Sequence, residues 1–278
     1  MRFHVTPYHS NLIKDKDRLA AFFEGFDESF SKNKNLETAF DIGCGSGVLS
    51  FFASQYFNNI IAIDIDSKII DYAKKSFKEA QIENVNFVCE DASSFDFKES
   101  ADLIICEMLD TALIDEEEVP VLKNAKRYLK EGGKIIPQGI INIAEPVHME
   151  RENIHYEDEE CHGIKPNYKV LGKGVKFSEL NFLENLEEEF KAKISFSLDS
   201  KINLMDNYFN GIKITTFTKI TEDIICGPTP MLNPPLFIPV DTPKEKYYKN
   251  NNALINKISV ELEYIMGGGV ESIKTSIL

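Results

Sequence analysis

The chain has 278 residues, 43% of them hydrophobic and 27% charged, a composition that is ordinary for a water-soluble globular protein. Its 45 acidic and 31 basic residues give a net charge of −14, the opposite of the basic surface with which enzymes of nucleic acids usually neutralise phosphates. This charge disfavours RNA or DNA as a partner and suits either solubility or a basic partner. No apolar run is long enough to span a bilayer, and the N-terminus lacks the features of a secretory signal.

The cysteines are odd in number and scattered, and they form no C-x-x-C pair. We expect buried free thiols in a reducing cytoplasm, with no membrane association and no bound metal. The five cysteines are Cys44, Cys89, Cys106, Cys161 and Cys226.

Residues 1–34 form an N-terminal segment that is predicted to be helical from 10 to 26. Residues 35–138 alternate apolar runs with amphipathic stretches, which is typical of a parallel sheet with crossover helices. The segment therefore predicts a doubly wound, Rossmann-like α/β domain. Its expected strands are 38–42, 60–64, 85–88, 103–106 and 134–136, and its expected helices are 48–57, 67–80 and 119–129.

Residues 139–278 have a different pattern, which indicates an antiparallel β domain. Strands are expected at 141–147, 193–198, 212–220 and 258–264, and in the last of these apolar and polar residues alternate strictly. Three glycines at 267–269 predict a turn into a final strand that ends near Ile277, which makes a hairpin. One helix is expected near 178–190, and the proline-rich stretch 226–243 is expected to be an irregular loop.

Residues 41–47 read D-I-G-C-G-S-G and lie between the first predicted strand and the helix after it. Glycines at such a turn let the backbone bend sharply and approach a ligand closely. Asp64 ends the next strand, where an acid can bond a ribose diol, and Asp91 follows the third strand. A dinucleotide-binding fold shares the glycines and Asp64. Asp41 separates a dinucleotide from a ligand with a cationic amino-acid end, because a carboxylate before the first glycine repels a phosphate but attracts a cationic group.

The motifs D-I-G-C-G-S-G-V-L-S, A-I-D-I-D, C-E-D-A and L-K-E-G-G-K-I-I-P resemble, as an ordered set, those of class I S-adenosylmethionine-dependent methyltransferases. The resemblance covers residues 41–137 and implies S-adenosyl-L-methionine as the cofactor. It places the methionine part at Asp41 and the glycine turn, the ribose at Asp64 and the adenine at Asp91. The cofactor-binding residues that it implies here are Asp41, Gly43, Cys44, Gly45, Asp64, Ile65, Asp91 and Ala92.

A narrower resemblance follows the fourth predicted strand, in the segment E-M-L-D-T-A-L-I-D-E. Glu107 and Glu116 are spaced as in the double-E loop of protein arginine methyltransferases, which implies that both are catalytic. Two carboxylates can clamp a guanidinium in a planar, bidentate way and leave a nitrogen lone pair aimed at the methyl group. For Glu116 an alternative stays open, because residues 115–118 are all acidic and suit the first turn of the next helix.

Upstream, H-S-N-L-I-K-D-K-D-R resembles the segment that opens the same family. The resemblance implies that Arg18 pairs with the carboxylate of the cofactor and that His9 lies close to it. A solvated helix of mixed charge is the alternative. The family also has a β-barrel after the fifth strand, as the second half suggests, and its habit of dimerising implies a homodimer.

The sequence departs from the family in the barrel. Arginine methyltransferases have a T-H-W loop whose histidine pairs with the acid of the N-terminal helix, but residues 227–236 contain no histidine and the chain has no tryptophan. Asp15, the helix acid, therefore lacks its expected partner and reads as a solvated acid, unless Asn233 supplies a neutral hydrogen bond. The absence indicates either a weaker acid–base apparatus or an acceptor other than arginine.

Three functions follow from these observations. The first is a methyltransferase that acts on a basic nitrogen of a protein. The second is an enzyme of the same fold that acts on a small molecule, another protein side chain or RNA. The third is a protein that binds the cofactor without catalysis and uses the barrel as a partner surface.

Overall fold

Five parallel strands form the sheet at the centre of the first half, in the order β3-β2-β1-β4-β5. The computed structural model describes residues 1–32, 36–157, 167–199, 208–241 and 257–278. The order reverses between β1 and β4, and ligands of open α/β sheets bind at the carboxyl ends of the strands at such a point. The strands are β1 (Leu36–Ile42), β2 (Phe57–Asp64), β3 (Val85–Cys89), β4 (Ala101–Cys106) and β5 (Leu129–Ile136).

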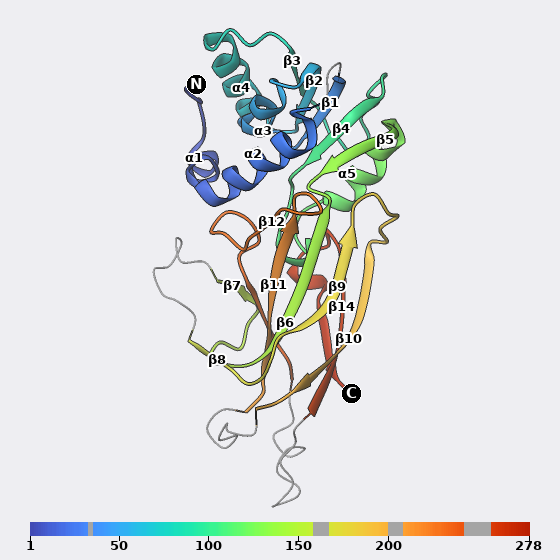
Figure 1. The fold of residues 1–278 in the computed structure, drawn as a ribbon. Coiled ribbons are helices and arrows are strands. Elements are labelled where there is room, and N and C mark those ends of the chain that lie inside the picture. Colours follow the sequence, from blue (N-terminus) through green and yellow to red (C-terminus); the bar gives the residue numbers. More distant parts are fainter. Residues whose placement is uncertain (33–35, 158–166, 200–207, 242–256) are drawn as a thin grey trace, which may run out of the picture.

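The helices cover both faces of this sheet, with α1–α4 on one side and α5 on the other (Figure 1). Their bounds are α1 (Pro7–Lys14), α2 (Lys16–Phe30), α3 (Val48–Ala53), α4 (Ser67–Glu79) and α5 (Glu118–Ala125), with 3₁₀ turns η1 (Thr111–Leu113), η2 (Lys126–Tyr128) and η3 (Val270–Ser272). Within the described ranges, no helix is long and apolar enough to cross a membrane.

The predicted order of strands and helices in residues 36–137 is confirmed, while several bounds differ. The predicted N-terminal helix is two helices, because Asp15 is extended and its side chain accepts a hydrogen bond from the Arg18 N–H to begin α2. The helix that follows the glycine turn ends at Ala53, since residue 57 already belongs to β2. The last strand of the parallel sheet, β5, begins at Leu129 rather than at residue 134. It therefore includes the two glycines at which the preceding helix was predicted to end.

The second half consists of two antiparallel sheets, which lie below the parallel sheet in Figure 1 and form a barrel-like domain. One apolar core runs through both halves, from Phe22 of α2 to Leu262 of β14. The predicted hairpin is confirmed, since β14 pairs with β15. The strands are β6 (Gly139–Met149), β7 (His155–Tyr156), β8 (Tyr168–Val170), β9 (Val175–Asn181), β10 (Glu189–Ser197), β11 (Gly211–Lys219), β12 (Ile225–Cys226), β13 (Leu236–Pro239), β14 (Lys257–Ile265) and β15 (Lys274–Ile277).

The helix predicted near 178–190 is wrong. Residues 175–181 form β9 beside β6, and residues 189–197 form β10 beside β14. Phe182, in the turn between them, is fully buried and its N–H donates to the Gln138 carbonyl, whereas Leu183 is half exposed. Pairing with distant strands outweighs the local helical spacing of apolar residues. Cys161 and the last two residues of the predicted irregular loop lie outside the described residues, and β12 and β13 occupy parts of that loop.

Candidate functional site

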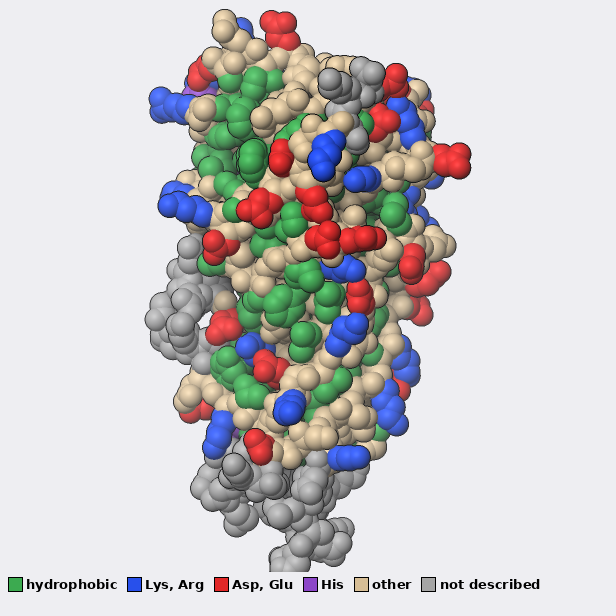
Figure 2. Space-filling view, viewed as in Figure 1, with side chains coloured by type: hydrophobic (Ala, Val, Ile, Leu, Met, Phe, Trp, Pro, Cys, Tyr) green, Lys and Arg blue, Asp and Glu red, His purple; other side chains and the backbone are tan. Residues whose placement is uncertain are grey.

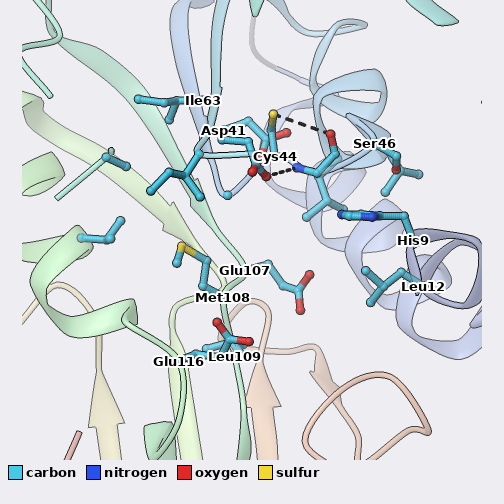
Figure 3. Close-up of a pocket in the computed structure, with 18 of the residues that line it drawn as sticks. His9, Leu12, Asp41, Cys44, Ser46, Ile63, Glu107, Met108, Leu109 and Glu116 are labelled. Atoms are coloured by element: carbon cyan, nitrogen blue, oxygen red, sulfur yellow. Dashed lines mark hydrogen bonds between the residues drawn. The ribbon is translucent and has the colours of Figure 1, made fainter. Parts of the chain in front are cut away.

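One cavity of about 270 Å³, at the carboxyl ends of β1–β4, brings together every site residue that the sequence predicts. Figure 3 labels five of them, His9, Asp41, Cys44, Glu107 and Glu116. The strands supply the glycine turn and the acids, while α1 and α2 supply His9 and Arg18 from the other side. The predicted residues in the wall are His9, Arg18, Asp41, Gly43, Cys44, Gly45, Asp64, Ile65, Asp91, Ala92, Glu107 and Glu116.

The glycine turn is shaped for close approach. Gly43 and Gly45 have φ of +66° and +50°, values that residues with a Cβ rarely adopt. A Cβ on Gly43 would lie 2.6 Å from Cγ of Met108, and one on Gly45 would lie 2.9 Å from Cδ2 of His9. The turn is fixed to the next strand, because the Gly45 N–H donates to Oδ2 of Asp64 at 2.9 Å. It is therefore a preformed cradle with no room for side chains.

His9 closes this cradle from α1. Its Nδ1 lies 2.7 Å from the hydroxyl of Thr6, the residue that caps the helix, and burial lowers the pKa of the ring. Burial thus favours the neutral form of the ring, which offers a flat surface and a hydrogen-bonding nitrogen to a ligand in the cavity.

The three strand-end acids have different environments. Asp64 is half-buried and accepts backbone N–H bonds from the turn and from Asp66. Asp91 is exposed at the rim, and hydrogen bonds from the Ser93 side chain and backbone lower its pKa. Asp41 is buried and accepts a hydrogen bond of 2.5 Å from Ser50; burial nevertheless raises its pKa to about 7. Asp41 is thus poised to ionise when a cationic group approaches.

Arg18 extends from α2 into the cavity wall and pairs there with Glu107. Its guanidinium is 3% exposed, Nη2 donates to Oε2 of Glu107, and Nη1 lies 3.5 Å from the Leu12 carbonyl. Its Nε is buried without a hydrogen-bond partner among the described residues. The Nε–H therefore remains as a donor for an anionic group.

Glu107 and Glu116 extend into the same space (Figure 3). Burial raises the pKa of Glu107, although the neighbouring Arg18 lowers it. Partial burial, together with repulsion from Glu107 and two other carboxylates, raises the pKa of Glu116. The helix after them, α5, begins at Glu118, so Glu116 lies in the loop before it rather than in its first turn.

A second cavity of about 850 Å³ lies against the first, at the side that faces the barrel. It is walled by acids and prolines, and Tyr156 lies in its wall. Among the described residues, four side chains line both cavities, and Glu116 is one of them. We call the place where they lie the passage between the two cavities. These shared residues are Tyr8, Leu109, Glu116 and Met231.

Asp15 has partners in the barrel, so its interpretation as a solvated acid is wrong. Its Oδ2 accepts a hydrogen bond of 2.5 Å from the Thr229 hydroxyl and one of 3.2 Å from the Met231 N–H. Asn233, the suggested partner, instead donates to the Thr218 hydroxyl at 2.7 Å. A neutral hydroxyl in the barrel loop thus contacts the helix acid.

Sequence reasoning missed several residues of the site. Met108 covers Gly43, Tyr8 and Met231 border the passage, and Asp110 lines the second cavity. Met108 and Tyr8 are direct neighbours of predicted residues, which is a usable signal. No signal in the sequence marks Met231, because its position depends on the contact between the barrel loop and the start of α2.

Comparison with known proteins agrees with this geometry. Residues 39–133 match the family described as "Methyltransferase domain". The chain contains this domain and is an S-adenosylmethionine-dependent methyltransferase. The cofactor of the methyltransferase is S-adenosyl-L-methionine, as predicted. An uncharacterized protein of Methanothermobacter thermautotrophicus is 42% identical over 278 residues, which is all of both chains, so its likeness includes the barrel half.

Solved structures show the fold of the methyltransferase as a whole. A Trypanosoma brucei PRMT1 enzyme–prozyme complex with AdoHcy aligns with a TM-score of 0.71 at 14% identity, over 98% of this chain and 96% of that one. Arabidopsis thaliana protein arginine methyltransferase 10 aligns with a TM-score of 0.72 at 14% identity, over 98% of each chain. The predicted combination of a Rossmann-like domain and a following β-barrel domain is confirmed.

Proposed function

We propose that this methyltransferase transfers a methyl group to a basic nitrogen of a protein, with the guanidinium of arginine as the acceptor. The observation that carries the proposal is that Glu107 and Glu116 line the same cofactor cavity, and that Glu116 also lines the larger acidic cavity beside it. Such a pair suits a planar cation that carries several N–H donors.

For the cofactor, the residues fit a zwitterionic nucleoside. Bound S-adenosyl-L-methionine supplies an electrophilic methyl group on a sulfonium. We assign the free Nε–H of Arg18 to its carboxylate, Asp41 to its cationic amino-acid end, Asp64 to the ribose diol and Asp91 to the adenine. His9 and the glycine turn enclose it, which excludes water from the methionine end.

For the acceptor, Glu107 and Glu116 have different tasks. Glu107 is paired with Arg18, which fixes its direction and favours its ionised form against the effect of burial, which raises its pKa. It orients the guanidinium and draws the positive charge away from the nitrogen that attacks. Glu116 borders the passage and has a raised pKa, so its carboxylate is the group in position to take the proton that the nitrogen loses.

The test uses Glu107→Gln with labelled S-adenosyl-L-methionine and a peptide of glycine and arginine. We expect at least a 100-fold loss of methyl incorporation, on the order of the loss from removing one charge-stabilising group, while cofactor affinity measured by calorimetry changes little. Glu24→Gln, an exposed glutamate of α2, is the matched control and should keep full activity. Incorporation into the peptide that survives Glu107→Gln would contradict the proposal. Mass spectrometry of endogenous proteins with and without the enzyme identifies the natural acceptor.

A further inference from the structure

The loop that carries the two glutamates, residues 107–116, is sharply folded where it has no glycine. Ala112 and Leu113 have φ of 61° and 59°, left-handed values that residues with a Cβ adopt rarely. The surrounding structure must hold this bend in place. We call residues 107–116 the acceptor loop.

Asp110 lies inside the bend, and its carboxylate accepts the peptide N–H groups that follow it. Oδ2 accepts from Ile114 and Asp115, each at 3.0 Å, and Oδ1 accepts from Glu116 at 3.3 Å. The last donor is the backbone of the proposed proton acceptor itself. One side chain, 9% exposed, thus fixes three successive peptide groups.

Tyr156 of β7 connects this arrangement to the barrel. Its hydroxyl donates to Oδ2 of Asp115 at 2.5 Å and is shared with Oδ2 of Asp110 at 3.2 Å. The ring lies in the wall of the second cavity beside Glu116. A barrel side chain therefore contacts the end of the acceptor loop at which Glu116 lies.

Other barrel residues hold the bend through different atoms. The Ala112 N–H donates to the Thr216 hydroxyl at 3.0 Å, the Tyr264 hydroxyl donates to the Ala112 carbonyl at 3.0 Å, and the Gly267 N–H donates to the Leu113 carbonyl at 2.9 Å. None of these bonds uses the carboxylate of Asp110. Loss of the Tyr156 hydroxyl should therefore leave the bend intact and loosen only the Glu116 end, which keeps the bond from the Val270 N–H to Oδ1 of Asp115 at 3.1 Å.

We propose that Asp110 and Tyr156 are positioning residues that hold Glu116 at the passage between the two cavities, where it faces the same cavity as Glu107. Neither is assigned to the methyl transfer step. The predicted kinetic effect rests on the proposed function, whereas the predicted change in backbone order does not. The two predictions are therefore tested by separate measurements.

The experiment compares Asp110→Asn and Tyr156→Phe with the wild-type enzyme, all full length. Tyr128→Phe is the matched control, because the Tyr128 hydroxyl also donates to a carboxylate, Asp96, at 3.2 Å, and neither residue lines the two cavities. Amide hydrogen exchange of residues 114–116 can be measured without a substrate that accepts the methyl group. We expect it to be about tenfold faster in both variants, as for the loss of one hydrogen bond, and unchanged in Tyr128→Phe.

Steady-state kinetics with the glycine–arginine peptide are the second measurement. We expect the KM for the peptide to rise about 5- to 10-fold in both variants while the KM for the cofactor stays constant, a split that a general loss of folding does not produce. Unchanged exchange in folded Tyr156→Phe would overturn the inference, as would faster exchange with an unchanged peptide KM. If Asp110→Asn does not fold, Tyr156→Phe decides. If the wild-type enzyme leaves the peptide unmodified, the arginine proposal falls, and hydrogen exchange still tests the positioning.

Discussion

At the scale of single residues, Asp41 has the most informative environment. Burial makes its carboxyl group ionise reluctantly and raises its pKa to about 7, although the hydrogen bond from Ser50 favours the ionised form. A bound cation would lower that pKa, because opposite charges favour the ionised form. Binding of the amino-acid end of the cofactor should therefore release a proton from Asp41.

This linkage gives a pH dependence for cofactor affinity. The pKa of Asp41 is about 7 in the free enzyme and lower in the complex, so affinity should rise as pH increases towards 7 and level off above it. Below pH 7 we expect a fall of up to about tenfold per pH unit. Calorimetry with S-adenosylhomocysteine between about pH 5.5 and 8 measures it. In Asp41→Asn, binding should be weaker and this slope should vanish. An identical slope in the variant would assign it to another group.

At the scale of elements, the barrel loop and the N-terminal helices form a clasp over the cofactor cavity. Thr229 and the Met231 backbone bind Asp15, and the Asp15 side chain in turn caps α2, whose first turn carries Arg18. Met231 also reaches both cavities. The contact between loop and helix therefore sets the place of Arg18, which lines the cavity.

Thr229→Val should weaken this clasp, because it removes the hydroxyl but keeps the shape of the side chain. We expect about 1 kcal/mol of lost unfolding free energy, measured by denaturant titration, and a several-fold weaker cofactor affinity. Thr229→Ser keeps the hydroxyl and should behave as wild type. Equal stability and affinity in all three proteins would show that the Asp15 contact has no energetic role.

What the sequence could predict follows from how far apart the interacting residues lie. The sequence predicts the glycine turn, Asp64 and Asp91 because each lies at or near the end of a strand with a clear apolar run, and parallel strands end at one edge of their sheet. The Asp15–Thr229 bond joins residues that are 214 positions apart, and no local pattern marks it. The helix expected near 178–190 failed for the same reason, since its residues pair with β6 and β14.

At the scale of the whole molecule, the chain has a net charge of −14, and the second cavity is itself lined by acidic side chains. Acidic side chains appear across the visible face, with several gathered where the two halves meet (Figure 2). The summed field attracts basic ligands over long distances and is weakened by salt. The charge that argued against nucleic acid thus suits a basic polypeptide.

The peptide KM should therefore depend on ionic strength. Between about 50 and 500 mM salt we expect it to rise several-fold for an acceptor peptide with flanking lysines, because the Debye length shortens to a few ångströms. A matched peptide with glutamine at the flanking positions should show a much smaller rise. Equal salt sensitivity of the two peptides would contradict long-range attraction by the acidic surface.

The bonds between the acceptor loop and the barrel also determine when the enzyme can first act during synthesis. The Tyr264 hydroxyl and the Val270 N–H reach back 152 and 155 residues to hold Ala112 and Asp115. A ribosome has therefore translated residues 107–116 long before the segment that secures them exists. A half-made chain therefore has the glycine turn but lacks the bonds that fix the acceptor loop, and it also lacks the Thr229 hydroxyl that binds Asp15 beside Arg18. The whole site is assembled only when the barrel has been synthesised and has folded onto the first half.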